Sequence, residues 1–375
     1  MSKMYFRELI LTTPWLKKLY LKRRSQTTND LMNTQQLEKY LNEADKVFLD
    51  KSVNIYVGLV KDADNYADQG LVKERAYFPK YERFLKNNNI AYEFYDPLSS
   101  NWMEQAKKFD LIIWHTDSDP STQEIAQSKI HIFEKMAIKC LPSYDEIWSY
   151  ENKIRASYLY ELYGLPAIPT YISHSRVEVL EYLKTASYPI ISKLSTGSAS
   201  FGVDKLDDFS QAKKVVDQIF SYKGKETYFK YANQKDYVYF QEFIDDATFD
   251  LRIMSVGDDL FGYYRYPNQG DFRASGAGNY EKKEIPEEAL ELAYQVKEVF
   301  GSNFLATDFV YSEKRKKFLI IESSIFIGVD TCEQLSINGV AGKYVRISEN
   351  QFEFKSGKFW VQELTLKNLI EKYFT

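Results

Sequence analysis

Hydrophobic and polar positions follow two different periods over residues 52–137. Apolar runs rich in β-branched and aromatic residues predict strands at 52–60, 90–96 and 110–116. Apolar positions at helical spacing predict helices at 75–88, 99–109 and 121–137. Strands that alternate with helices in this way are typical of a small parallel α/β domain. No GxGxxG pattern follows the first strand, so we do not expect a dinucleotide site there.

The pattern changes near residue 150. A helix predicted over 151–163 ends at the segment GLPAIP, and longer strands with hairpin signals follow. We therefore expect a domain boundary there. The expected organisation is a basic helical extension over 1–50, an α/β domain over 51–148, two lobes over 149–240 and 241–350, and a strand and helix over 351–375.

Composition and charge exclude several classes of protein. Hydrophobic residues make up 44% and charged residues 27% of the 375 residues, as in ordinary globular proteins. The net charge of -4 argues against bulk nucleic-acid binding. The two cysteines and three histidines lack the spacing of a disulfide framework or a zinc site. We interpret the chain as cytoplasmic.

Residues 1–25 mix aromatic and aliphatic residues with lysines and arginines. The segment lacks the uninterrupted apolar core of a secretory signal, and no window of the chain is apolar enough to span a membrane. A basic amphipathic segment can make peripheral contact with an anionic membrane, here the inner face. Packing on the protein body is the favoured interpretation.

The stretch YPIISKLSTGSASFGV, residues 188–203, predicts a β-hairpin with a tip of small residues. Lys193 precedes the glycine-containing run, whereas a Walker A lysine follows the glycines and opens a helix. A hairpin of this type can cover phosphates, because its tip donates N–H groups while a strand lysine reaches the oxygens. A plain turn fits these residues equally well.

Three later segments place polar residues within strand or loop patterns. Each has a bland alternative, an exposed strand face or a surface loop. They are the strand 237–246 with Gln241 and Glu242, the hairpin 248–266 with Asp250, Arg252 and Arg265, and the loop 268–280 with Asp271 and Arg273. An arginine at a glycine-lined bend suits a transferring phosphoryl group.

A hairpin predicted over 304–324 carries one carboxylate on each strand, Asp308 and Glu322. Both occupy apolar positions, where an unpaired carboxylate would be unfavourable. Two facing carboxylates on adjacent strands suit Mg²⁺, with nucleotide phosphates completing its octahedron.

Taken in order, these features resemble the ATP-grasp superfamily, and within it the branch of the ribosomal-protein glutamate ligase and glutathione synthetase. The resemblance covers about residues 140–350 and rests on NKIRASYLYELYGLPAIPT, PIISKLSTGSASFGV, DLRIMSVGDDLFG, GDFRASG and TDFV…FLIIESS. It implies an α/β fold in which a small parallel pre-ATP-grasp domain precedes a two-lobed ATP-grasp domain, with ATP between the lobes.

The resemblance also implies roles for individual residues. Contacts with the nucleotide phosphates are expected from Lys153 and Lys193, under a lid of Ser195, Thr196, Gly197, Ser198 and Ser200. The adenine pocket is expected at Gln241, Glu242, Phe243 and Ile244, the ribose end at Asp250, and the γ-phosphate region at Arg273 and Ser275. Arg252 and Arg265 are expected to bind phosphate or carboxylate, and Asp308, Glu322 and Ser324 one or two Mg²⁺.

One residue departs from the family pattern. Ser324 stands where the family has the asparagine of a Glu-x-Asn motif, so weaker binding of a second metal is expected. The altered turn after it also changes the expected acceptor pocket.

The implied reaction joins a small-molecule or glycan carboxylate to an amine through an acyl phosphate. We expect this ligase to act in surface-polysaccharide or secondary-metabolite biosynthesis, with a peptide or amino-acid ligase as the near alternative. A non-catalytic ATP-binding sensor or scaffold and a kinase of the same fold are further alternatives.

Overall fold

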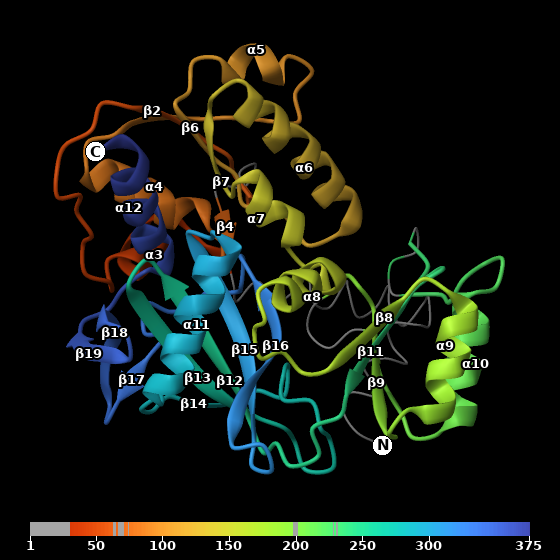
Figure 1. Cartoon of the computed structure of the whole chain (residues 1–375). Coiled ribbons are helices and arrows are strands. Elements are labelled where there is room, and N and C mark those ends of the chain that lie inside the picture. The colour runs from red at the N-terminus through yellow and green to blue at the C-terminus, as the bar shows by residue number, and fades with distance from the viewer. Residues whose placement is uncertain are drawn as a thin grey trace.

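The computed structural model describes residues 31–62, 65–66, 71–73, 75–197, 202–227, 229 and 232–375, with the backbone alone for 65, 66 and 71. A parallel sheet, a small antiparallel sheet and a large antiparallel sheet form the body of the molecule (Figure 1). This mixed α/β architecture confirms the expected fold class. Residues 1–25, Ser198 and Ser200 lie outside the described part of the chain.

The parallel sheet has the order β5-β2-β6-β7. Its strands are β2 (Tyr56–Leu59), β5 (Ala91–Phe94), β6 (Leu111–Ile113) and β7 (Lys139–Leu141), packed with α4 (Phe78–Asn87), α5 (Trp102–Ala106), α6 (Pro120–Lys135) and α7 (Tyr144–Ser149). The predicted strands and helices are confirmed, while β7 was missed because three residues are too short for a periodic pattern. The strand order reverses between β2 and β6, which opens a crevice at their carboxyl ends.

The small antiparallel sheet has the order β10-β9-β11-β8. It contains β8 (Thr170–Ser173), β9 (Ile190–Lys193), β10 (Val203–Leu206) and β11 (Val238–Glu242), and α9 (Arg176–Thr185) and α10 (Phe209–Ile219) lie on one side of it (Figure 1). The predicted hairpin is confirmed, with Lys193 opposite Val203. Side chains of the sheet and both helices form a core of their own, separate from the main core.

The large antiparallel sheet has the order β16-β15-β12-β13-β18-β17, with β14 added to β13 and β19 to β18. Its strands are β12 (Asp250–Val256), β13 (Asp259–Tyr266), β14 (Asn279–Glu281), β15 (Phe304–Ser312), β16 (Lys317–Ser324), β17 (Ser336–Ile337), β18 (Val340–Ser348) and β19 (Gln351–Ser356). Helix α11 (Glu287–Phe300) packs on it and ends at Gly301, whose φ of 60° suits a glycine cap. Asp308 and Glu322 are register partners, as the hairpin predicts.

Helix α8 (Lys153–Leu162) lies between the three sheets (Figure 1). The Asn152 side chain accepts a hydrogen bond from the backbone N–H of Arg155 and caps the helix. The Lys153 backbone N–H donates to the Ser195 carbonyl at 2.8 Å, which ties the helix to the glycine-containing loop. The first side chains of α8 therefore face the space between the two antiparallel sheets.

The C-terminal helix α12 (Val361–Phe374) packs on α4 of the parallel domain. Arg83 of α4 pairs with Glu363 at 2.7 Å, and both side chains are buried. The Trp360 indole donates to the Leu41 carbonyl at 3.0 Å. The last helix of the chain thus packs on the parallel domain.

Apolar residues at helical spacing over 34–48 predict a longer helix than the structure shows. Helix α3 (Thr34–Leu41) ends seven residues short of that pattern's end. Its Ala44 and Val47 are nevertheless buried, because they pack beside the helix in an irregular segment. The remaining strands, β1 (Leu31–Met32), β3 (Asn65–Tyr66) and β4 (Leu71–Lys73), form a separate three-stranded sheet.

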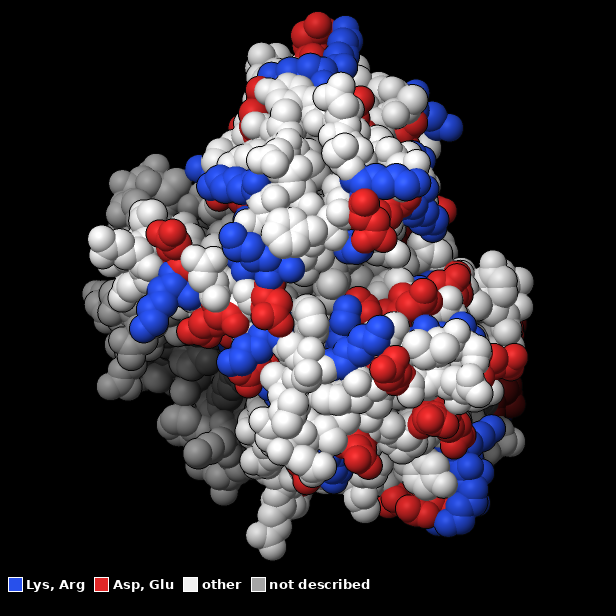
Figure 2. All heavy atoms as spheres, turned by 90° about the vertical axis from the view of Figure 1, so that its left-hand side faces the viewer, with Lys and Arg blue, Asp and Glu red and all other residues white. Residues whose placement is uncertain are grey.

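The surface carries both signs of charge. In Figure 2, lysines and arginines alternate with aspartates and glutamates over the described residues of one face, and neither sign forms a continuous patch. Among the described helices, none is long and apolar enough to cross a bilayer.

The buried pair between α4 and α12 gives a test of this packing. Arg83→Met should lower the free energy of unfolding by about 3–5 kcal/mol, because it leaves the Glu363 carboxylate buried without a cation. Urea denaturation measures the change. Lys86→Met, which removes the exposed Lys86–Glu82 pair on the same helix, should change it by about 1 kcal/mol or less. Equal effects of the two substitutions would contradict this account.

Candidate functional site

Two cavities meet between the lobes. The larger, about 470 Å³, is called the polar cavity, and the smaller, about 230 Å³, the apolar cavity. Six residues line both cavities and form their junction: Lys153, Arg265, Ser275, Asp308, Ile321 and Glu322. A ligand in one cavity would therefore touch the same charged groups as a ligand in the other.

The apolar cavity gathers residues that the sequence assigned to a nucleotide. Beyond the junction, its lining includes Lys193, Gly197, Gln241, Glu242, Phe243, Ile244, Asp250 and Arg273. Ile168, Ile191 and Val203 add apolar walls from the small sheet. Such walls with a few polar groups suit a planar base with a charged tail. The individual nucleotide contacts stay predictions.

Lys193 is buried at the end of β9, with 6% of its surface exposed. Its Nζ donates to Gln241 Oε1 on the neighbouring strand β11 at 2.6 Å. Burial lowers the pKa of Lys193 to about 8, since a charged ammonium is poorly solvated there. The side chain is therefore fixed in place and close to losing its charge near neutral pH.

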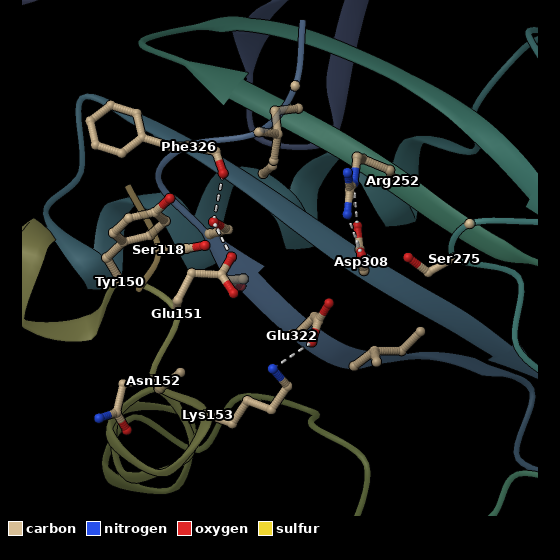
Figure 3. Close-up of a pocket in the computed structure, with 18 of the residues that line it drawn as sticks. Ser118, Tyr150, Glu151, Asn152, Lys153, Arg252, Ser275, Asp308, Glu322 and Phe326 are labelled. Carbon is tan, nitrogen blue, oxygen red and sulfur yellow. Dashed lines mark hydrogen bonds and ion pairs between the residues drawn. The ribbon is translucent and has the colours of Figure 1, made fainter. Parts of the chain in front are cut away.

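Lys153 and Glu322 face each other at the junction, 3.5 Å apart (Figure 3). Burial alone would lower the pKa of Lys153, but Glu322 and Glu151 raise it above its usual value. Burial would likewise raise the pKa of Glu322, yet Lys153 holds it below its usual value. The Lys153 Nζ also donates to the Gly197 carbonyl at 2.6 Å. This lysine thus links the metal-type carboxylate to the glycine-containing loop.

Asp308 is held by two arginines. Arg252 binds both of its oxygens at 2.7 Å, and Arg265 Nη2 binds Oδ2 at 2.6 Å (Figure 3). Burial would raise the pKa of Asp308, but the two guanidiniums lower it well below its usual range. The Arg265 Nε donates to Asp250, whose pKa is raised by burial. Asp250 is therefore part of this network as well as of the apolar cavity.

The carboxylates suit Mg²⁺ in their chemistry. Asp308 and Glu322 are opposed in register on adjacent strands and offer the oxygen ligands that Mg²⁺ prefers. Their charges are balanced here by Arg252 and Lys153. Among the described residues, no group of three or more His, Cys, Asp or Glu gathers as a metal site. Phosphate oxygens and water would have to supply the other ligands, so the metal role stays a prediction.

The other predicted residues lie around these two cavities. Ser195 and Thr196 line neither cavity. The Ser195 N–H donates to the Tyr237 hydroxyl, and Thr196 pairs with Asn152 in an isolated antiparallel β-bridge. Glu242 pairs with Arg315, and Arg273 Nε with Asp271 Oδ1 at 3.1 Å. Ser324 lines the polar cavity, where its hydroxyl lies 2.8 Å from the Phe326 carbonyl and 3.2 Å from Glu151 Oε1.

Sequence reasoning missed the wall of the polar cavity that comes from the parallel domain. Tyr77, His115 and Thr116 line this wall together with Tyr150 and Glu151. The signal was present for two of them, because His115 and Thr116 come two and three positions after β6, where the carboxyl end of a parallel strand borders a crevice. No local sequence pattern indicates a role for Glu151. Its place in the cavity wall depends on a backbone φ of 49°, which the sequence pattern does not reveal.

If Lys193 binds the nucleotide phosphates, as the sequence predicts, nucleotide binding should depend on pH. A lysine with a lowered pKa loses its proton as the pH rises through that value, so the affinity for ATP should fall about tenfold between pH 7.5 and 9.5. Isothermal titration at each pH measures it. Lys193→Arg should show no such fall, because a guanidinium stays charged. A flat profile for the natural protein would contradict the assignment.

Comparisons with known proteins bear on the same residues. The chain is 34% identical over 176 residues to the alpha-aminoadipate–LysW ligase LysX of Saccharolobus solfataricus, covering 46% of this chain and 60% of that protein. The ligase of the same name from Sulfurisphaera tokodaii is 28% identical over 196 residues, covering 51% and 65%. The chain thus spans less than two thirds of either relative's length.

A solved structure shows the same fold at low identity. D-cycloserine synthetase DcsG matches with a TM-score of 0.54 and 11% identity over 84% of this chain and 99% of that one. A family model, the RimK-like ATP-grasp domain, matches residues 151–347, more than half of the chain. The matched residues include all six side chains at the junction of the two cavities, and the chain belongs to the RimK-like ATP-grasp family.

Proposed function

We propose that the chain is an ATP-dependent ligase that joins a carboxylate to an amine through an acyl phosphate. The observation that carries this proposal is the shared junction of the two cavities. Lys153, Asp308 and Glu322 line both, so a nucleotide in the apolar cavity and an acid in the polar cavity would meet at these charges. The ligase names of the relatives agree with this class of reaction.

The apolar cavity is the proposed nucleotide site. Ile168, Ile191 and Phe243 would hold the base, and Lys193 and Lys153 would bind the phosphates. When bound, Mg²⁺ neutralises charge on the phosphoryl oxygens, and Asp308 and Glu322 would hold it. The buried lysines place positive charge where the phosphoryl group is transferred, in a site of low dielectric constant.

The reaction needs no protein nucleophile. A carboxylate oxygen of the acid attacks the γ-phosphorus, the bond from this phosphorus to the β–γ bridging oxygen breaks, and ADP leaves. The neutral amine then attacks the acyl carbon, the carbon–oxygen bond to phosphate breaks, and a proton is lost to solvent. The side chains therefore position the reactants and balance charge, which accounts for lysines, arginines and carboxylates at the junction.

The substrates that we propose are suggested by the names of the relatives. Those proteins are named for α-aminoadipate and LysW, an amino acid and its partner. We infer that the amine substrate of this chain is also an amino acid. The glycan acid and polysaccharide pathway expected from the sequence find no support in these names, and a small-molecule or protein carboxylate is the remaining class of acid.

ADP release tests this proposal. The full chain with ATP and Mg²⁺ is supplied with pairs drawn from L-amino acids, including L-2-aminoadipate, and from dicarboxylic acids, sugar acids and acidic peptides. We expect ADP only when both an acid and an amine are present, and an amide product by mass spectrometry. A phosphorylated product would indicate a kinase, and ATP binding without ADP release from any pair would indicate a sensor.

Glu322→Gln should lower ADP formation about 100-fold or more, because one of the two carboxylates that would hold Mg²⁺ against the phosphoryl oxygens is lost. Glu313→Gln is the matched control, since Glu313 lies exposed in the turn of the same β15–β16 hairpin and pairs only with Lys316 among the described residues. The control should keep full activity. Equal rates for the two variants would reject the proposed site.

A further inference from the structure

The polar cavity extends beyond the junction toward the parallel sheet. Its far wall comes from the carboxyl ends of the parallel strands and from the segment before α8. The residues that form this wall are Tyr77, His115, Thr116, Ser118, Tyr150 and Glu151. None of them lines the apolar cavity, so this end of the cavity is distinct from the proposed nucleotide site.

The positive charges that line the polar cavity are already paired. Arg75 pairs with Asp330 at 3.0 Å and Lys153 with Glu322, while Arg252 and Arg265 both bind Asp308. Glu151 has no lysine or arginine within ion-pair distance among the described residues. Its only hydrogen bond within that part of the chain comes from the Ser324 hydroxyl, 3.2 Å from Oε1. A half-buried carboxylate therefore faces the cavity without an ion-pair contact among the described residues, although Lys153 lies near enough for its charge to act on it.

The backbone at Glu151 holds this carboxylate in the cavity wall. Its φ of 49° lies in the left-handed region, which is unfavourable by about 1–2 kcal/mol for a residue with a Cβ. Such a conformation persists only where the surroundings impose it. In Figure 3 the Glu151 and Glu322 side chains enter the same space, from the segment before α8 and from β16.

Two orphaned polar atoms point to a ligand independently. Among the described residues, neither the Thr116 hydroxyl, on a residue that is 1% exposed, nor Nδ1 of His115 has a hydrogen-bond partner. Leaving a buried hydroxyl unpaired is unfavourable by about 1–3 kcal/mol. The two residues come two and three positions after the end of β6, at the crevice where the strand order reverses and ligands of such sheets bind.

Aromatic rings complete the wall. Tyr77 stacks on His115 with ring centroids 3.7 Å apart, and Phe326 packs edge-on against His115 and Tyr150. Burial lowers the pKa of His115 to about 3, so its ring is neutral and adds no positive charge. Rings attract a cation through their faces, and a carboxylate without a partner attracts it more strongly. The chemistry of this wall fits an ammonium group.

We propose that this end of the polar cavity is the subsite for the amine substrate, in which Glu151 pairs with the ammonium group. Thr116 and His115 would form hydrogen bonds with polar groups of the substrate next to the ammonium. The proposal rests on the ligase function proposed above and names the group that the amine substrate must carry. From this position the ammonium group, once it has lost a proton to solvent, would lie beside Glu322 and Lys153 as the neutral amine that attacks the acyl phosphate. Glu151 is thus a substrate-binding residue that sequence reasoning did not indicate.

Isothermal titration of the full chain with Mg²⁺ and the non-hydrolysable analogue AMP-PNP tests the subsite. The probes are the common L-amino acids and L-2-aminoadipate, each beside its counterpart without the amine, such as adipate. We expect an amino acid to bind more tightly than its counterpart. Glu151→Gln should weaken that binding about 10- to 100-fold and leave the counterpart unchanged, because only the ion pair is lost.

Further variants separate charge from structure. Glu151→Asp, which keeps the charge, should retain more affinity than Glu151→Gln. Thr116→Val should weaken binding about 3- to 10-fold without loss of stability, because the hydroxyl has no partner within the described part of the chain. Glu161→Gln, an exposed carboxylate on α8, is the matched control and should bind as the natural protein does.

Three results would overturn the subsite. The first is equal binding of amino acids by Glu151→Gln and the natural protein, and the second is no binding of amino acids at all. The third is a changed Mg²⁺ dependence of AMP-PNP binding in Glu151→Gln, which would make Glu151 a metal ligand. If ADP release still requires an amine while Glu151→Gln leaves its KM unchanged, the subsite fails and the ligase function stands. If no amine is ever consumed, the ligase function fails.

Discussion

The burial of one carboxylate organises the centre of this molecule. Asp308 lies on β15 of the large sheet with 3% of its surface exposed, and an ionised group there must be neutralised by its neighbours. Arg252 does so from the adjacent strand β12 and Arg265 from β13, the strand beyond it, and Asp250 in turn balances Arg265. The sheet can therefore carry charge at its core only as this complete network. Loss of any member would leave the buried network with a net charge.

The same constraint separates the two cavities by chemistry. The network and the Lys153–Glu322 pair form a charged band between an apolar space under the small sheet and a polar space under the parallel sheet. Each space is bounded by a different domain, so the base and the amine of the proposed reaction would contact independent sets of residues. The paired cations and anions lie in the band, where they are fixed by strands and by α8. Each domain thus bounds a different cavity, because the buried charges lie between the two cavities.

Much of this arrangement could be predicted from local patterns. The hairpins that carry Lys193, Asp308 and Glu322 follow from alternation and turn residues, and their register is as expected. What could not be predicted depends on contacts between distant segments. Arg83 meets Glu363 and so docks the C-terminal helix on the first domain, and no pattern within either helix indicates the partner. Glu151 likewise became visible only once its backbone conformation and the paired state of its neighbours were known.

The two lobes touch through backbone at one point of particular interest. The Ile168 N–H donates to the Ile320 carbonyl at 3.0 Å, and the Ile320 N–H to the Pro166 carbonyl at 2.9 Å. If the small sheet rotates to admit a nucleotide, this pair of bonds is a natural pivot. Atoms near a pivot sweep short arcs, and Glu322 is two residues away from it. The carboxylate would stay in place while the distal edge of the small sheet, on a long lever arm, travels furthest.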